Sequence, residues 1–173
     1  RHDAFAQLMM GQHSKVLAQL DARPEVLSGW PRVALFDGPV GVGWATNEGQ
    51  HGDAGLFTLF AQHVVPPPVG GHGDADPDSR SWFSSLLTAM TPGAADHVTS
   101  KVWVDSWVHD PWTGGSYAAF GPGHYARYAG FLGQPEGGIH FAGEHTVLST
   151  MGYLDGAVGS GERAARQVLD SLA

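Results

Sequence analysis

Cysteine is absent from the 173 residues of this chain. Its absence excludes a disulfide framework, a thiolate metal site and a cysteine nucleophile. Cations are also scarce, with 9 Lys and Arg against 17 Asp and Glu and a formal net charge of −8. Because contacts to phosphates need clustered Lys and Arg, we expect no nucleic-acid partner.

Long apolar runs and metal-ligand spacings are missing as well. No run approaches the ~20 apolar residues of a membrane-spanning helix and no signal peptide is visible, so we expect no membrane partner. None of the 10 His stands in a His-Glu-x-x-His or similar spacing, which predicts no metal site. The chain starts at Arg1 rather than Met, so we expect it to have been trimmed or processed. Nothing in the sequence indicates the compartment or the oligomeric state.

The composition is that of a folded protein. Hydrophobic residues make up 42% of the chain and charged residues 15%, which excludes a disordered tail. The length suits one ordinary domain with enough apolar material for a buried core.

Short apolar runs separated by turn residues predict an antiparallel sheet in the first two thirds of the chain. The expected strands lie within 11–20, where a turn leads into a strand that carries Lys15 near its start, and at 33–36, 40–46, 56–60 and 98–104. A loop rich in Pro, Gly and Asp is expected over 62–78, followed by an amphipathic helix over 79–90 that stops before Pro92. Gly41-x-Gly43 is rejected as a dinucleotide fingerprint, because Thr46 stands where the third Gly belongs.

The C-terminal forty residues predict a strand, a glycine turn and a helix. Ile139–Ala142 has the pattern of a short buried strand, and a helix is expected from about Thr150 onward, capped by Ser149 or Thr150. Gly152 leaves the first turn uncovered, so the positive end of the helix dipole would face an electron-rich ligand edge. Periodicity alone favours a strand, a Gly-rich turn and a docking helix without a ligand. Its apolar or small residues recur at a spacing of three and four: Leu154, Ala157, Val158, Gly161, Ala165, Val168, Leu169 and Leu172.

Several ordered motifs carry more information than the periodicity. They are Phe-Ala-Gly-Glu-His-Thr at 141–146, Gly-Tyr-Leu-Asp-Gly-Ala-Val at 152–158 and Ser-Gly-Glu-Arg-Ala-Ala at 160–165. Together they closely resemble the C-terminal flavin-binding segment of the flavin-containing amine oxidase family, which includes monoamine, polyamine and L-amino-acid oxidases and flavin lysine demethylases. Trp107, Asp-Pro-Trp at 110–112, Gly-Ser-Tyr at 115–117 and Phe-x-Pro-Gly at 120–123 follow in the family's order.

The resemblance implies an α+β chain that forms part of the two-domain FAD-dependent oxidase fold. Residues 1–106 would belong to the substrate-binding domain with its antiparallel sheet, and residues 107–173 to the C-terminal strand and helix of the FAD-binding domain. Complete members begin with a Rossmann βαβ unit carrying Gly-x-Gly-x-x-Gly, and this chain has no such motif. We therefore expect a companion polypeptide that carries it, without which the chain should bind FAD poorly and be inactive.

The resemblance also implies catalytic and substrate-binding residues. Lys15 in Gly11–Val16 matches the family's Gly-x-x-x-Lys-Val segment, whose Lys holds a water against the flavin N5 atom. Without the resemblance, a Lys near the start of a strand is usually a solvated edge charge. Tyr117 and Tyr153 match the two aromatic positions that flank the substrate amine before the flavin. Paired aromatic faces favour cationic forms of an amine by about 0.5–2 kcal/mol.

The cofactor implied is noncovalent FAD. Some family members bond the flavin through a Cys at the position of Ser116, and this chain has no Cys. Glu144 would lie near the ribityl or diphosphate region, and the amides of Gly152 to Leu154 would face the flavin C2 carbonyl. The full set of expected cofactor-binding residues is Trp107, Trp112, Gly115, Ser116, Gly143, Glu144, Gly152, Tyr153 and Leu154.

The reaction implied is oxidation of a substrate C–N bond to an imine, with dioxygen reduced to hydrogen peroxide. Tyr153 followed by Leu154 favours primary or secondary amines, and an L-amino-acid oxidase is the alternative. Two further interpretations stay open. The chain could be a non-catalytic truncated remnant that acts as an assembly or binding module, or an unrelated globular domain.

Overall fold

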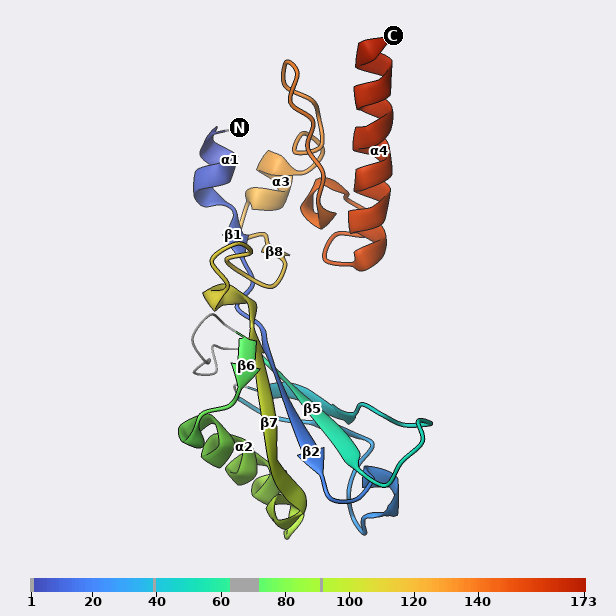
Figure 1. The fold of residues 1–173 in the computed structure, drawn as a ribbon. Coiled ribbons are helices and arrows are strands. Elements are labelled where there is room, and N and C mark those ends of the chain that lie inside the picture. The colour runs from blue at the N-terminus through green and yellow to red at the C-terminus, as the bar shows by residue number, and fades with distance from the viewer. Residues whose placement is uncertain (1, 39, 63–71, 91) are drawn as a thin grey trace. The chain divides into compact units, whose positions relative to one another are not determined.

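The computed structural model describes residues 2–38, 40–62, 72–90 and 92–173 (Figure 1). The chain forms two compact units. One runs from Gln12 to Ser116, and the other combines the residues up to Gly11 with Tyr117–Ala173. The sequence prediction instead placed one boundary after Ser106, so the divisions differ by ten residues at that end and by the N-terminal segment.

The unit from Gln12 to Ser116 is built on an antiparallel sheet, as the sequence predicted, and the sheet has six strands. Its strand order is β3-β4-β5-β2-β7-β6. The strands are β2 (Ser14–Leu20), β3 (Val33–Leu35), β4 (Val40–Ala45), β5 (Gly55–Ala61), β6 (His72–Asp74) and β7 (Val98–Ser106). Short 3-10 turns lie at Pro24–Val26, Ala94–His97 and Trp107–His109.

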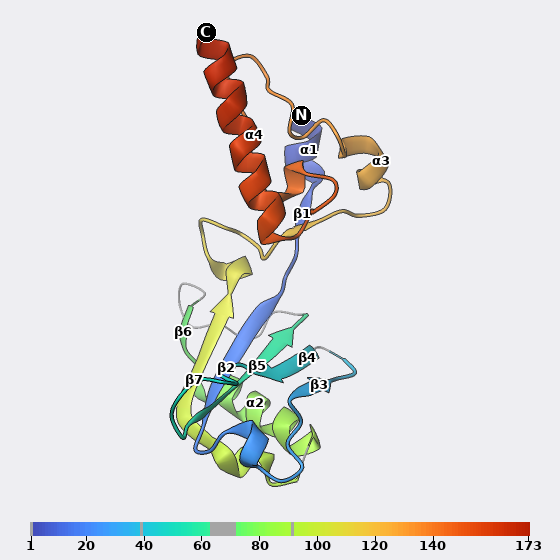
Figure 2. The same ribbon diagram turned by 90° about the vertical axis from the view of Figure 1, so that its right-hand side faces the viewer.

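One face of this sheet is buried and the other is open. Along β2, Val16 and Ala18 are fully buried, whereas Lys15 on the alternate face is exposed. The buried face packs against α2 (Pro77–Met90) (Figure 2). Phe83 and Leu87 of α2 belong to the same core. The alternation of two residues per repeat in β2 therefore separates a core face from what we call the open face, the one that carries Lys15.

Part of the expected loop over 62–78 is regular structure. Residues 63–71 of that prediction lie outside the described residues, but His72–Asp74 forms β6 and α2 already begins at Pro77. The loop prediction was wrong there because a three-residue strand is held by its pairing with β7 and has no periodicity of its own.

Gly43 of β4 has a packing role, since a Cβ on it would lie 2.7 Å from Leu59 Cδ2.

The other unit has a smaller core. Helices α1 (His2–Gln7) and α3 (His124–Tyr128) meet through Tyr128, which is 2% exposed and donates a hydrogen bond from its hydroxyl to Gln7 Oε1 at 2.7 Å. Strand β1 (Met9–Met10) pairs with β8 (Ala118–Ala119) in an antiparallel ribbon. The N-terminal residues are thereby tied to the segment that follows Tyr117.

The predicted strand at Ile139–Ala142 is absent. These residues form a loop with a single antiparallel bridge between Glu136 and Ile139, and the Ile139 side chain is 62% exposed. The prediction was wrong because a strand persists only with a neighbouring strand to receive its hydrogen bonds, and the described residues offer it none beyond that bridge.

The predicted C-terminal helix is confirmed as α4 (Leu154–Leu172). It begins later than expected, and its N-cap is Tyr153, which makes no side-chain capping hydrogen bond. Ser149 and Thr150 are therefore not caps, because they lie before the turn that Gly152 makes with a φ of 85°. No helix in the described part of the chain is long and apolar enough to cross a bilayer.

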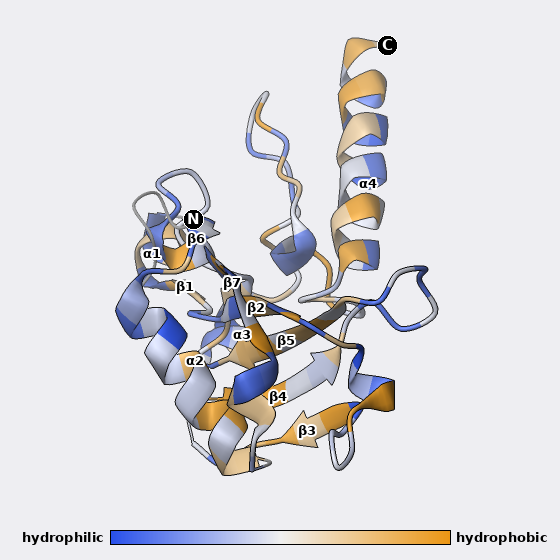
Figure 3. Cartoon of the chain, turned by 60° about the horizontal axis from the view of Figure 1, so that its bottom comes forward, coloured by the Kyte–Doolittle hydropathy of each residue, from blue (hydrophilic) through white to orange (hydrophobic). Residues whose placement is uncertain are grey.

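The apolar side of α4 is exposed. Figure 3 shows hydrophobic residues recurring along the helix. The side that faces its own unit carries Gly156 and Ser160, the only two buried residues of the helix. We call the exposed apolar side the α4 stripe, and it consists of Leu154, Val158, Gly161, Ala165, Leu169 and Leu172. The helix thus packs through small and polar residues and leaves its apolar residues uncovered in the described chain.

Candidate functional site

Lys15 lies on the open face of the sheet. Its direct cross-strand neighbours are Phe60 of β5 and Asp105 of β7, and its side chain is exposed. The same face holds a hollow of about 480 Å³, lined in part by Leu17, Lys101 and Trp103. A ligand lying against this face would therefore meet Lys15 without any change in the core.

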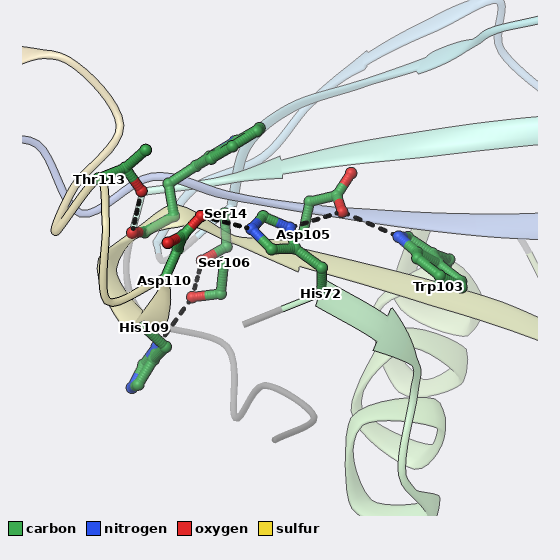
Figure 4. A network of polar contacts seen from close by, with 9 residues as sticks. Ser14, His72, Trp103, Asp105, Ser106, His109, Asp110 and Thr113 are labelled. Atoms are coloured by element: carbon green, nitrogen blue, oxygen red, sulfur yellow. Dashed lines mark hydrogen bonds and ion pairs between the residues drawn. The ribbon is translucent and has the colours of Figure 1, made fainter. Parts of the chain in front are cut away.

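A row of polar side chains continues from Lys15 across the sheet. Asp105 is the direct neighbour of both Lys15 and His72 of β6. His72 Nδ1 lies 3.0 Å from Asp105 Oδ1, its Nε2 lies 3.5 Å from Asp110 Oδ2, and Trp103 Nε1 donates to Asp105 Oδ1 at 2.8 Å (Figure 4). Sequence reasoning missed His72, because its partners come from a strand pairing that no local pattern reveals.

The loop after β7 is organised around Asp110. The Asp110 Oδ1 atom accepts a hydrogen bond from the Trp112 amide at 2.7 Å, and its carbonyl accepts one from the Gly114 amide at 2.9 Å. Thr113 Oγ1 donates to the Trp107 carbonyl at 3.1 Å. The amide of Trp112, and to a smaller degree His72, holds the pKa of Asp110 below its usual value of 3.8.

This lowered pKa makes the support that Asp110 gives the loop dependent on pH. A depressed pKa in the folded state adds stability above the unfolded value, and that stability is lost as the pH falls through the folded value. We expect Asp110→Asn to lower the free energy of unfolding by a constant amount above about pH 4, and by less below it. Chemical denaturation at several pH values measures this difference. Asp53→Asn, in an exposed turn, controls for the loss of one negative charge. A difference that did not shrink in acid would contradict the role given to the Asp110 carboxylate.

The four predicted residues of this loop have different exposures. Trp107 is 40% exposed and its ring lies edge-on to His72, with centroids 4.6 Å apart, while Trp112 is 94% exposed. Gly115 is buried, and Ser116 Oγ accepts a hydrogen bond from the His13 amide at 3.3 Å. Gly115 and Ser116 are therefore held in place, whereas the Trp112 ring is free to contact a ligand or another polypeptide.

In the other unit, Glu144 joins two predicted site segments. Its Oε1 atom accepts a hydrogen bond from the Ala118 amide at 2.8 Å, and its Oε2 atom accepts one from the Gly152 amide at 2.6 Å. The structure thus brings together the residue after Tyr117 and the residue before Tyr153. Neither link is visible in the sequence, because 26 residues separate Glu144 from Ala118.

The turn that carries Glu144 is fastened to α4. The Gly143 amide donates to Ser160 Oγ at 2.9 Å, and Ser160 is fully buried. Arg163 Nη2 donates to Thr146 Oγ1 at 2.9 Å and to the Phe141 carbonyl at 3.1 Å. Ser160 and Arg163 were missed as site-building residues, although their spacing of three on one helical face is a signal for a shared contact.

The two tyrosines have different surroundings. Tyr117 is partly buried, and this burial raises the pKa of its hydroxyl. Its carbonyl accepts a hydrogen bond from the Gly11 amide at 2.6 Å. Tyr153 is 72% exposed and stands as the N-cap of α4. One ring is therefore packed and the other projects freely from the helix start.

The start of α4 suits an electron-rich ligand edge. No side chain caps the helix, so the amides of its first turn keep their donor capacity. Gly152 has open space where a Cβ would stand, and Leu154 is 87% exposed. Of the three amides predicted to face an isoalloxazine edge, that of Gly152 is bound by Glu144 and that of Tyr153 by the Thr150 carbonyl. The Leu154 amide lies in the uncapped first turn, beside the open space at Gly152. The described residues contain no group of three or more His, Asp or Glu placed to hold a metal ion.

Gly156 holds the loop before α4 against the helix. A Cβ at this position would lie 2.3 Å from the Thr150 carbonyl oxygen, whereas a Cβ on Gly159 would meet nothing. We expect Gly156→Ala to destabilise the chain by about 1–3 kcal/mol, because backbone must move. Gly159→Ala is the matched control and should stabilise it by up to about 1 kcal/mol through helix propensity. Chemical denaturation measures both. Equal effects at the two positions would contradict the close approach.

Comparison with known proteins places these residues in context. The profile of the family described as flavin containing amine oxidoreductase matches residues 77–169. Flavin-containing amine oxidase B of Cavia porcellus is 47% identical over 68 residues, which cover 39% of this chain and 13% of that protein. Flavin-containing amine oxidase A of Sus scrofa is 44% identical over 91 residues, which cover 52% of this chain and 16% of that protein.

Solved structures show the same fold. Putrescine oxidase bound to putrescine superposes with a TM-score of 0.77 at 21% identity, covering 98% of this chain and 37% of that one. Cyclohexylamine oxidase from Brevibacterium oxydans gives a TM-score of 0.76 at 22% identity, covering 96% of this chain and 37% of that one. The chain therefore spans 13 to 16% of the length of these two amine oxidases and just over a third of the solved structures.

Proposed function

Because this chain belongs to the flavin-containing amine oxidoreductases, whose profile matches more than half of it, we propose that it forms the C-terminal part of an FAD-dependent amine oxidase. The observation that carries the proposal is the Glu144 carboxylate, which ties the Tyr117 segment to the uncapped start of α4. In that arrangement the aromatic residues expected around the amine and the amides expected at the cofactor belong to one compact unit.

The proposed cofactor is noncovalent FAD. The uncapped first turn of α4, which begins at Leu154, and the open space at Gly152 suit the electron-rich edge of an isoalloxazine. Ser116 cannot form a thioether, and the chain offers no Cys elsewhere. When bound, the flavin would accept the hydride equivalent that leaves the carbon next to the amine nitrogen, the nitrogen would lose a proton to give the imine, and dioxygen would take the two electrons and two protons as hydrogen peroxide.

The protein would contribute position and proton handling. Lys15, exposed on the open face, would hold a water and manage its proton at the reacting edge of the cofactor. Tyr117 and Tyr153 would orient the amine through their ring faces.

The proposed substrates are primary or secondary amines. Tyr153 followed by Leu154 supports this class, and two structural neighbours are named as oxidases of putrescine and cyclohexylamine. An L-amino-acid oxidase is the alternative, and it would need a cation to hold the substrate carboxylate. Anaerobic addition of a primary amine or an L-amino acid to the flavoprotein distinguishes the two, because only the true substrate class bleaches the flavin absorbance.

The proposed partner is a polypeptide segment that carries the Rossmann dinucleotide-binding unit. The α4 stripe supports this, since Leu154 and Leu172 are 87% and 79% exposed and the described chain covers neither. The stripe equally favours a second candidate function, a non-catalytic assembly module. A purified sample with flavin bands that amines bleach would support the oxidase. Assembly with a partner in the absence of flavin bands would support the module.

A further inference from the structure

The single carboxylate of Glu144 holds the backbone on both sides of the proposed amine site. Ala118, whose amide donates to Oε1, follows Tyr117 directly, and Gly152, whose amide donates to Oε2, precedes Tyr153 directly. We propose that Glu144 is a positioning residue that sets the separation of the Tyr117 and Tyr153 rings and thereby the selection of the amine. This inference rests on the proposed function, because it concerns the same pair of tyrosines.

The geometry leaves these two segments little freedom. The Tyr117 carbonyl accepts a hydrogen bond from the Gly11 amide, so this segment is held on both sides. The Tyr153 amide donates to the Thr150 carbonyl at 3.2 Å, and Gly152 takes a φ of 85° that other residues rarely adopt. Since the distance between the two oxygens of one carboxylate is invariant, Glu144 keeps the Ala118 and Gly152 amides at a constant spacing.

The turn that carries Glu144 is itself held to α4 by hydrogen bonds. Gly143, the residue before it, is hydrogen-bonded to the buried Ser160 of α4, and Thr146 Oγ1 donates to the Gly143 carbonyl at 2.7 Å. Arg163 in turn donates to Thr146 Oγ1. The carboxylate is therefore anchored to the same helix whose N-cap is Tyr153, which fixes the spacing of the two tyrosine segments.

This role requires a carboxylate. An ionised carboxylate is an acceptor at both oxygens, which matches two N–H donors, whereas a Gln amide would present an NH₂ group to one of them. Charge-assisted hydrogen bonds of this kind are about twice as strong as neutral ones. Glu144→Gln is thus nearly isosteric and removes one acceptor, and Glu162→Gln on the exposed side of α4 is the matched control.

The first test needs no bound flavin. Hydrogen exchange of the backbone amides, measured on the 173-residue chain, should show faster exchange at Gly152, Ala118 or both by about 10- to 100-fold in Glu144→Gln. Protection within α4 should stay as in the unaltered chain, and Glu162→Gln should match the unaltered chain at both amides. Unchanged protection of Ala118 and Gly152 would overturn the proposal.

The second test uses the complete flavoprotein that contains this chain. Glu144→Gln should raise the KM for a primary amine by about 3- to 30-fold, the range that loss of aromatic alignment allows, with the flavin content per protein retained. In a Tyr153→Ala background the same substitution should have little further effect on KM, because the spacing then has no second ring to set.

Two outcomes of this second test would overturn the positioning role. One is a loss of flavin content in which the molecules that still hold flavin keep an unchanged KM. This result would make Glu144 a direct cofactor contact. The other is an equal rise in KM in both backgrounds, which would show a general loss of structure. Failure of the proposed function has a different signature, since the unaltered flavoprotein would then not be bleached by any amine.

Discussion

Lys15→Met in the complete flavoprotein is expected to slow amine-dependent oxygen consumption by about 100- to 10,000-fold, the usual contribution of a positioned proton-handling group. The Lys15 side chain would hold a water at the reacting edge of the cofactor, and Met offers no donor for it. Reduction by the amine without oxygen should change far less, because the tyrosines and the helix start remain in place.

The position of Lys15 makes this variant a clean test. Its side chain is exposed on the open face, while Val16 beside it is fully buried, so Met at this position leaves the core untouched. Rapid mixing of the reduced enzyme with oxygen measures the step directly. Lys101→Met on β7 of the same sheet is the matched control, since it also lies at the surface and lines the hollow of the open face. Equal losses in the two variants would refute a specific role for Lys15.

Replacing two apolar residues of the α4 stripe, Val158→Asp and Leu169→Asp, is expected to prevent assembly with the dinucleotide-binding segment. Val158 and Leu169 are 64% and 67% exposed in this chain. Burying such side chains contributes about 1.5–3 kcal/mol each, and a buried unpaired charge opposes association further. The Val158→Asp/Leu169→Asp variant should therefore bind about 100-fold more weakly or worse.

Size-exclusion chromatography with detection of flavin absorbance measures this loss, whether the dinucleotide-binding segment stands in the same polypeptide or in a second one. Arg166→Asp is the matched control, because it adds an Asp to the charged side of the same helix and loses only a surface ion pair at 3.8 Å to Glu162. Retention of flavin by the double variant would show that the α4 stripe is not the contact surface.

The two predictions probe different units of the chain. Lys15 belongs to the sheet unit, and the α4 stripe belongs to the unit that holds Glu144. Their variants should consequently fail in different ways. The first should keep its flavin and lose turnover, whereas the second should lose its flavin. A variant of either kind that failed in the manner of the other would show that the roles of the two units are wrongly assigned.

Local patterns in the sequence were sufficient for most elements. Strands β2, β4, β5 and β7 and helix α4 were predicted within a few residues, because alternation and helical spacing arise between neighbours in the chain. The family was also predictable, since its motifs are ordered runs of adjacent residues, and the profile match confirms it. The missing strand at 139–142 shows the limit, because an apolar run does not specify a pairing partner.

By itself, then, the sequence determined five of the six strands of the sheet, the two longer helices, the family and the absence of a Cys for covalent flavin attachment. Only the tertiary structure decided that His72 joins Asp105 and Asp110, that Glu144 bridges Ala118 and Gly152, and that α4 packs through its small residues. The physical reason is distance along the chain. Secondary structure follows from interactions within a few residues, whereas these contacts join segments whose meeting depends on how the whole unit packs.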